Sequence, residues 1–439
     1  MHFHAALRGF ILGLFGFLFL LTPLAAQSAA APHDAELQFV LVLSRHGIRS
    51  PLGNPEFHNK YSAAPWPTWN VAPGILTTHG YELMKLFGIW DRAEWAGDGL
   101  FAPSGCDGAE RVSVITDNDQ RTRATGKALT EGIFPGCTIA LQSQPDGVRD
   151  PLFLPLESGA VHPDAARLTA AVSGRIGGDP NRLTEAYRPQ LTALDRVLAG
   201  CGKLPANAKR ISIFDVPASL TPGSGGKGTF SLRGPVPTGA SLAGDLLLEY
   251  TQGMSEADTG WGCLNGETLR YVMQLTAAGW EYEKRTPTVA RMNSTGLLES
   301  ILKTLEQNAS GKPVKGALGK PGDRLVLLVG HDTNIAALSG ALGVNWIMDG
   351  RISDPAPGGA LRFEIWRARA DGKLSVRLVY AAQTLDQMRR AEPLTPANPP
   401  AEAVLFVPAC SRADQSCSWE DFSTAARQAI DPAYLTAQP

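Results

Sequence analysis

The sequence predicts an α/β fold, with a mixed central sheet flanked by helices and an inserted α-helical cap. The first indication is 37–43 (LQFVLVL), an apolar, β-branched-rich run with no polar face, as expected for a strand buried on both sides. The runs 111–116 (RVSVIT) and 324–329 (RLVLLV) have the same form. Polar residues follow each run, and we expect helices at 120–132 and 334–342. Repeated strand–loop–helix units predict a ligand site at the carboxyl ends of the strands.

A second indication is a predicted hairpin, which makes the sheet mixed. The runs 360–369 (ALRFEIWRAR) and 374–381 (LSVRLVYA) are joined by the turn-like 370–372 (ADG). By contrast, 162–282 is largely helical in pattern, with a stretch rich in Gly, Pro and Ser at 217–239. We interpret this section as a helical cap over the strand ends.

The N-terminus has the order of a secretion signal, with a basic start, an apolar middle and a region of small residues: His2, His4 and Arg8, then 10–21, then 25–31. A membrane anchor would need about 20 consecutive apolar residues. Thr22 and Pro23 interrupt the run before that length. We therefore expect 1–31 to be a signal peptide that is removed, leaving a soluble periplasmic or secreted protein.

The mature part of the 439-residue chain exceeds a typical single domain, so we expect one large domain that carries an inserted smaller one. We assign 32–161 and 286–439 to the α/β domain and 162–285 to the cap. Within the cap, 221–229 (TPGSGGKGT) superficially suggests a phosphate-binding P-loop. Thr221 stands where the first glycine is required, and Gly228 stands where Ser or Thr is required, so we expect a mobile loop.

Charge excludes some classes of partner. The formal net charge is −2 and the sequence has no basic run. A broad contact with nucleic acid or an anionic membrane surface is therefore not expected, and an anionic substrate must be held by a local cluster. We expect a monomer whose partner is a small molecule, without a cofactor.

Six cysteines form an even set, as in the disulfide frameworks of exported proteins. Six cysteines allow 15 pairings. Chain order suggests Cys106 with Cys137, Cys201 with Cys263, and Cys410 with Cys417. A zinc site is the alternative, but the spacings do not fit and no histidine lies near the cysteines in the sequence.

The first functional cluster is 45–51 (RHGIRSP), directly after the first predicted strand. Transfer of a phosphoryl group needs cations around its oxygens and a nucleophile in line with the leaving oxygen. Arg45 and Arg49 offer planar donors, and His46 offers a neutral ring nitrogen that can attack phosphorus. The alternative is a solvated basic turn, in which the two guanidinium groups would repel each other; a bound anion removes that conflict.

The second cluster is 330–334 (GHDTN), at the end of another predicted strand and the start of a helix. His331 and Thr333 would lie beside an anion at the helix N-terminus. Asp332 is the candidate general acid, since a neighbouring phosphate should raise the pKa of its carboxyl group. The alternative is that Asp332 only caps the helix.

The third cluster is 117–123 (DNDQRTR). Arg121 and Arg123 lie two positions apart, so on a helix only one of them can face the site. We expect Arg121 to be the third phosphate-binding arginine. The alternative is a surface helix cap with solvated arginines.

With these clusters the chain resembles the histidine acid phosphatases, and within them the periplasmic bacterial phytase and glucose-1-phosphatase group. RHGIRSP and GHDTNIA look like the two signatures of the family, and TDNDQRTRATG resembles the segment that supplies its third arginine. The resemblance extends over nearly all of the mature chain, through WPTWNV with LTTHG, QGMSEADTGWG, RTPTVAR, APGG and the segment from Cys410 to Trp419.

The resemblance implies a phosphoglycerate-mutase-like fold with no metal, and specific roles for the residues that match the signatures. His46 would be the nucleophile and Asp332 the proton donor, and the phosphate pocket would comprise Arg45, Arg49, Arg121 and His331. In the cap, Met254 and Glu256 fall where members of the family shape the substrate pocket.

Two departures concern the substrate. Phytases of this group tend to carry Thr-Lys after the signature proline, whereas Leu52-Gly53-Asn54 follows here, which is closer to the glucose-1-phosphatase pattern. Gly47, however, matches the phytase form of the signature. The resemblance thus implies an acid phosphatase of phosphate monoesters, with phytate and sugar phosphates such as glucose 1-phosphate both as candidate substrates.

Other classes of function remain as alternatives. A phosphoglycerate-mutase-like phosphotransferase would share the Arg-His loop, but a signal peptide and disulfides are not expected of it. A secreted, catalytically silent phosphate-binding protein would be expected to lack His46 or Asp332, and both are present.

Overall fold

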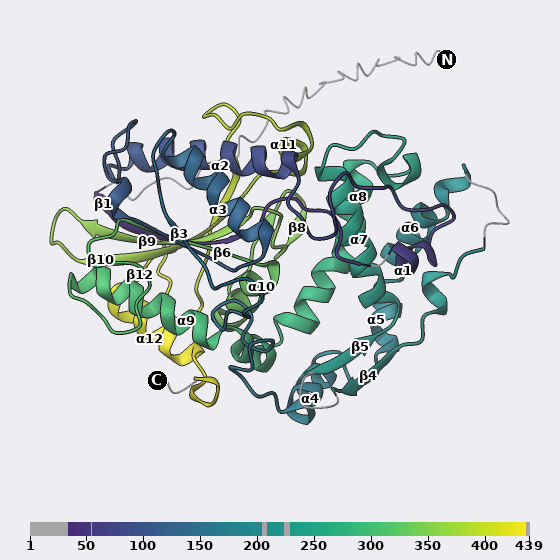
Figure 1. Ribbon diagram of the computed structural model, residues 1–439. Coiled ribbons are helices and arrows are strands. Elements are labelled where there is room, and N and C mark those ends of the chain that lie inside the picture. The colour runs from purple at the N-terminus through teal and green to yellow at the C-terminus, as the bar shows by residue number, and fades with distance from the viewer. Residues whose placement is uncertain (1–33, 54, 204–208, 224–228, 436–439) are drawn as a thin grey trace, which may run out of the picture.

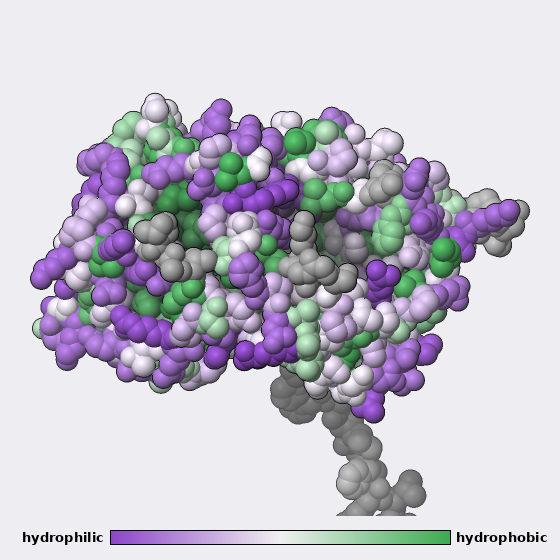
Figure 2. All heavy atoms as spheres, turned by 60° about the horizontal axis from the view of Figure 1, so that its bottom comes forward, coloured by the Kyte–Doolittle hydropathy of each residue, from purple (hydrophilic) through white to green (hydrophobic). Residues whose placement is uncertain are grey.

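The computed structural model describes residues 34–53, 55–203, 209–223 and 229–435. The expected signal peptide, 1–31, lies outside these residues. Among the helices of the described segments, none combines the length and the apolar character needed to cross a bilayer. Hydrophilic side chains cover most of the face shown in Figure 2, with apolar residues scattered between them.

The predicted mixed sheet is confirmed, and it has eight strands in the order β11-β10-β9-β1-β6-β2-β3, with β12 beside β10. The parallel strands are β1 (Ala35–Arg45), β6 (Leu325–Gly330), β2 (Val112–Thr116) and β3 (Leu141–Gln142). The antiparallel strands are β9 (Ala360–Ala368), β10 (Leu374–Ala382), β11 (Ala401–Val404) and β12 (Cys417–Ser418). The β9–β10 pair is the predicted hairpin.

Helices cover both faces of the sheet (Figure 1). One layer contains α2 (Thr78–Gly97) and α3 (Gln120–Ile133), and the other contains α9 (Pro287–Ser310), α10 (Asp332–Leu342) and α12 (Trp419–Ala429). Alternate residues of β1 serve the two layers: Leu41 and Leu43 belong to the core cluster on one side, and Val40 and Val42 to the cluster on the other. This double burial explains why the strand sequence has no polar face.

The cap lies beside one edge of the sheet (Figure 1). Its helices are α4 (Ala165–Arg175), α5 (Asn181–Ala186), α6 (Arg188–Leu198), α7 (Pro235–Thr251) and α8 (Gly266–Gly279), joined by α1 (Pro55–Asn59). Helices α5 to α8 share a hydrophobic core, to which Ile48 and Leu83 of the α/β part contribute, whereas Leu168 and Val172 of α4 pack in a separate cluster with Val289 and Met292 of α9. The cap is therefore packed onto the functional loop that follows β1. The exact domain boundaries remain a prediction.

The prediction of a mobile loop at 221–229 is partly wrong. Its ends belong to an antiparallel pair, β4 (Ser219–Pro222) and β5 (Phe230–Arg233), while 224–228 lie outside the described residues. Leu220 and Leu232 pack against the cap core, so burial of apolar side chains favours paired strands despite the Gly-rich sequence.

Shorter elements complete the described chain. They are β7 (Ile347–Met348), β8 (Arg351–Ile352), α11 (Leu385–Arg390), the 3₁₀ turns η1 (Ala109–Arg111), η2 (Gly200–Gly202), η3 (Ile213–Asp215), η4 (Thr259–Gly262) and η6 (Pro432–Tyr434), and the π-helical η5 (Trp280–Lys284).

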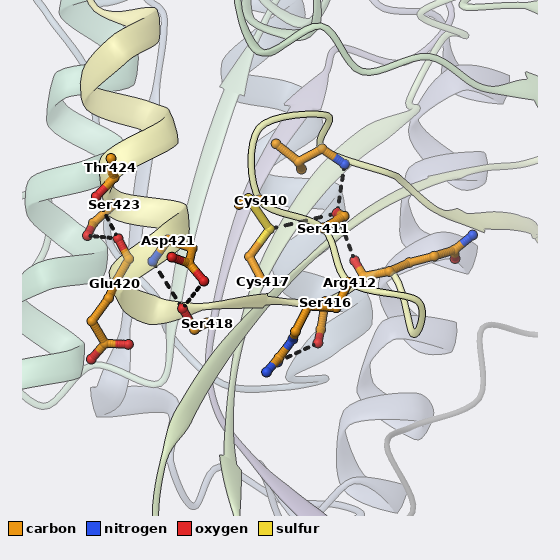
Figure 3. Close-up of a disulfide and its surroundings, with 12 residues drawn as sticks. Cys410, Ser411, Arg412, Ser416, Cys417, Ser418, Glu420, Asp421, Ser423 and Thr424 are labelled. Atoms are coloured by element: carbon orange, nitrogen blue, oxygen red, sulfur yellow. Dashed lines mark hydrogen bonds between the residues drawn. A yellow bond between two sulfur atoms is a disulfide. The ribbon is translucent and has the colours of Figure 1, made fainter.

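Two of the suggested disulfides are present, Cys106–Cys137 and Cys410–Cys417. The second closes a short loop that leads directly into α12, where Ser418 caps the helix by accepting from the backbone N–H of Asp421 at 3.0 Å (Figure 3). Cys201 and Cys263 are thiols in this structure. They are nevertheless neighbours that line the same pocket, and burial together with a hydrogen bond to Cys201 raises the pKa of Cys263.

We predict that Cys201 and Cys263 form a third disulfide when the protein folds in an oxidising compartment. A disulfide typically adds about 2–4 kcal/mol to the free energy of unfolding. Thiol titration of the denatured, unreduced protein should then find no free thiol, and Cys201→Ser should expose one thiol and lower the melting temperature by several degrees. Two titratable thiols in the unmodified protein would contradict this pairing.

Candidate active site

Three neighbouring parallel strands deliver the candidate residues to one edge of the sheet. In the register of β1, β6 and β2, Arg45 lies opposite Gly330, and Thr116 lies opposite Val329. The residues after the strand ends continue this register, because the backbone N–H of His46 donates to the carbonyl of Gly330 at 3.0 Å. Asp117 is held in the same way on Val329, also at 3.0 Å. Chain segments almost three hundred positions apart thus meet at their strand ends, as predicted.

His46 is buried, with 2% of its surface exposed. Its Nδ1 lies 2.8 Å from the carbonyl oxygen of Gly47, which can only accept, so Nδ1 carries the proton and Nε2 keeps its lone pair. Burial lowers the pKa of His46 well below its usual value, and Arg45 and Arg49 lower it further. A neutral imidazole with a free nitrogen is the form that can attack phosphorus.

Gly47 allows the loop to approach α2 closely. A Cβ at this position would lie 2.8 Å from Cγ of Met84 and 3.0 Å from the carbonyl oxygen of Gly80. The backbone N–H of Gly47 donates to Thr125 of α3 at 3.0 Å. The position of His46 is therefore fixed by packing against both helices of one layer.

Three guanidinium groups surround this imidazole. Arg45 donates to the carbonyl of Pro355 at 2.6 Å, Arg49 donates to that of Ser50 at 2.9 Å, and Arg121 pairs with Asp119 at 2.5 Å. The Nε atoms of all three arginines are buried and have no hydrogen-bond partner among the described residues. Burial, reinforced by Arg45, lowers the pKa of Arg49 to about 10, so this side chain stays charged in acid. Buried cations with unused donors are what a bound anion would satisfy.

Arg121 and Arg123 separate as expected. Arg121 lies close enough to His46 to lower its pKa, whereas Arg123 turns outward and pairs with the exposed Asp146 at 2.6 Å. The spacing of two residues on a helix therefore distinguishes the site residue from its neighbour.

His331 lies beside His46, with 5.7 Å between the ring centroids. Its Nε2 is 2.6 Å from Oδ2 of Asp117, a residue with no exposed surface. Burial alone would raise the pKa of Asp117, but the hydrogen bond with His331, the backbone N–H of Asn118 and the charge of Arg121 together outweigh burial, and the pKa lies below its usual value. The carboxylate thus fixes the ring and leaves Nδ1 as the other nitrogen available to an anion. Sequence reasoning gave Asp117 no role, although it follows a strand directly, as His46 does.

Asp332 is the first residue of α10, and both of its carboxylate oxygens have a partner. Its Oδ1 accepts from the backbone N–H of the half-buried Thr333 at 2.8 Å, and its Oδ2 lies 2.9 Å from NH2 of Arg45. Burial raises the pKa of Asp332, but Arg45, Arg49, His331 and the backbone N–H of Thr333 together outweigh burial, so the pKa lies below its usual value. Asp332 is therefore ionised in the free protein, and a proton-donor role depends on a substrate phosphate that competes for Arg45 and raises the pKa.

Asp117, Asp119 and His331 form a group whose donor atoms lie within 4.8 Å of one another, close enough to hold a metal ion. Asp117 and His331 are already hydrogen-bonded to each other. The guanidinium group of Arg121 already supplies a positive charge at Asp119. The donor set therefore favours an arginine-centred anion site over a cation site, and metal-independent chemistry remains our expectation.

A cavity of about 350 Å³ opens between this cluster and the cap. Arg45, Arg49 and Asp332 line one end, and α7 and α8 supply the opposite wall, with Asp245 and Trp280 among the lining residues. Met254 and Glu256 are not among the residues that line it. Glu256 is exposed, and the carbonyl of Met254 accepts from Arg389 at 2.8 Å. A substrate role for these two residues remains a prediction from resemblance.

These features are those of a histidine phosphatase. A family model for the histidine phosphatase superfamily (branch 2) matches residues 36–169 and 247–381, and the chain belongs to this family. Both the predicted family and the predicted fold class are thereby confirmed.

Among known proteins, the chain is 36% identical to phytase AppA of Escherichia coli over 433 residues, 96% of this chain and 98% of that protein. It is 28% identical to a glucose-1-phosphatase of Providencia rettgeri over 423 residues, 94% and 97% of the two chains. The solved structure of Hafnia alvei phytase in complex with tartrate matches with a TM-score of 0.85 and 32% identity, covering 92% of this chain and all of that one.

Asp117 should act by positioning the ring of His331, whose Nε2 lies 2.6 Å from its carboxylate. We expect Asp117→Asn to weaken competitive inhibition by inorganic phosphate about 10-fold, since one charge-assisted contact contributes roughly 1.5–3 kcal/mol and the amide retains part of it. The inhibition constant measured at several pH values checks this. Asp146→Asn, which changes the exposed partner of Arg123, is the matched control and should leave the constant unchanged.

Proposed function

We propose that the chain is an exported, periplasmic or secreted, acid phosphatase that hydrolyses phosphate monoesters through a phosphohistidine on His46. The observation that carries the proposal is the buried, neutral imidazole whose free Nε2 lies among three arginines with unused buried donors. Membership of the histidine phosphatase superfamily supports it independently.

In the first step, Nε2 of His46 attacks phosphorus, and the bond between phosphorus and the ester oxygen breaks. Arg45, Arg49 and Arg121 stabilise the charge on the three equatorial oxygens, and His331 contributes a further contact. The leaving alkoxide takes a proton from Asp332, whose carboxyl group lies next to Arg45 at 2.9 Å.

In the second step, water attacks the phosphohistidine. The Asp332 carboxylate produced by the first step accepts the proton of this water, and the bond between Nε2 and phosphorus breaks. Inorganic phosphate leaves, and His46 returns to its neutral form. Water as the acceptor distinguishes this reaction from that of a phosphotransferase.

The substrates we propose are phosphate monoesters of the kinds named by its relatives, phytate and sugar phosphates such as glucose 1-phosphate. The cap, 162–285 in our assignment, would contact the leaving group, because its helices form the wall of the cavity opposite the arginines.

The nucleophile is tested by His46→Ala. We expect turnover of an aryl phosphate to fall at least 10⁴-fold, because the variant lacks the nitrogen that attacks phosphorus in the proposed mechanism. Acid quench with a ³²P-labelled ester should trap acid-labile, base-stable phosphate on the unmodified protein and none on the variant. Tight phosphate binding with no turnover in the unmodified protein would instead favour a silent binding protein.

The proton donor is tested by Asp332→Asn. We expect kcat for an alkyl phosphate to fall about 10²–10⁴-fold, and kcat for an activated aryl phosphate to fall much less, because a good leaving group needs no proton. In the unmodified enzyme kcat for the alkyl ester should decline as pH rises, since Asp332 must be protonated in the complex, and the variant should lose this decline. Equal losses on both esters would remove Asp332 from this role.

A further inference from the structure

The wall of the cavity opposite the phosphate site carries a buried acid that the mechanism does not use. Asp245, on α7, lines the cavity together with Arg45 and Arg49 and is only 9% exposed. Its Oδ2 lies 3.2 Å from Nδ1 of His58, but the geometry is not that of a hydrogen bond. Oδ2 therefore has no hydrogen-bond partner among the described residues, although it is buried beside open space. A buried polar atom of this kind is costly unless something satisfies it.

His58 lines the cavity beside Asp245 and is held there by the loop that follows the arginines. A Cβ on Gly53 would lie only 2.4 Å from Cε1 of His58, so the ring occupies the space that a side chain at position 53 would fill. Burial lowers the pKa of His58, so the ring tends to be neutral. His58 and Asp245 therefore form a fixed polar surface on which the imidazole ring is uncharged.

The charges around the cavity are unsuited to several phosphate groups at once. Besides Arg45 and Arg49, Lys284 is the one Lys or Arg among the lining residues, all of which are described, and the acids Asp245 and Glu283 lie on the same cap wall. Burial raises the pKa of Asp245 to about 7 despite the attraction of Arg49, and burial also raises the pKa of Glu283. In acid these carboxyl groups are uncharged, and each can donate to one hydroxyl oxygen and accept from another.

We propose that Asp245, backed by His58, binds a hydroxyl group of the leaving group, and that the enzyme therefore prefers monophosphates of neutral polyhydroxy compounds, such as hexose phosphates, to polyphosphorylated ones. This inference rests on the proposed function. A second phosphate placed against the cap wall would lose its hydration and gain Lys284 as a single cation, which does not balance two negative charges beside the acids Asp245 and Glu283. A hydroxyl group at the same place satisfies the buried oxygen of Asp245.

The test compares three substrates near pH 5: glucose 1-phosphate, phytate and p-nitrophenyl phosphate, which has no hydroxyl groups. In the unmodified enzyme kcat/KM for glucose 1-phosphate should exceed that for phytate at least 10-fold. Asp245→Ala should lower the ratio of kcat/KM for glucose 1-phosphate to that for the aryl ester about 10-fold, the effect of losing one hydrogen bond. Each ratio comes from one preparation, so incomplete folding of the variant does not change it.

Glu249→Ala is the matched control. Glu249 is a second buried acid of α7, which accepts from the backbone N–H of Gly260 at 3.1 Å and does not line the cavity, so its loss should leave the ratio unchanged. The inference would be overturned if Asp245→Ala had the same ratio as the unmodified enzyme, or if the unmodified enzyme preferred phytate to glucose 1-phosphate. Neither result would affect the proposed phosphatase activity. Absence of aryl phosphate turnover in the unmodified enzyme would overturn the proposed function, and this inference with it.

Discussion

The gathering of three guanidinium groups around one buried imidazole is the constraint on which the rest of the structure depends. Two such cations 4 Å apart repel each other by about 4 kcal/mol at an effective dielectric constant near 20. The protein offsets this repulsion with carboxylates, since Asp119 pairs with Arg121 and Asp332 pairs with Arg45. The Nε donors of the three arginines still have no partner among the described residues, and a bound anion could accept from them.

Together with burial, the same positive charges explain the protonation state of His46, the proposed nucleophile. A histidine in water is charged below pH 6.5 or so, and would be useless as a nucleophile in acid. Burial and the neighbouring arginines keep His46 neutral, and the carbonyl of Gly47 fixes which nitrogen carries the proton. In the proposed mechanism, substrate binding and activation of the nucleophile therefore have one physical origin, because the arginines that would attract the substrate also favour the neutral form of His46.

The sequence allowed the sheet and most of the phosphate site to be predicted, because buried strands leave an apolar run and the residues after them are polar. Arg121 could be preferred to Arg123 from helix geometry alone. Asp117 received no role because a single Asp in a polar loop has no distinctive pattern. Asp245 and His58 were missed because their proximity depends on how α7 packs against the loop after β1. Met254 and Glu256 were taken from resemblance alone and are not among the residues that line the cavity, so their role stays a prediction. The β4–β5 pair was not predicted, because the surrounding glycines obscure its strand pattern.

The long-range pairing of β1 with β6 has a consequence for biosynthesis. Val40 to Arg45 lie beside Leu325 to Gly330, so the strand that carries the nucleophile has no neighbour on that side until most of the polypeptide has been made. A nascent chain cannot assemble the pocket, however well its earlier segments fold. If the chain is exported as we propose, a polypeptide that crosses a membrane with its N-terminus first cannot hydrolyse the phosphorylated metabolites of the compartment in which it is made, because β6 has not yet paired with β1.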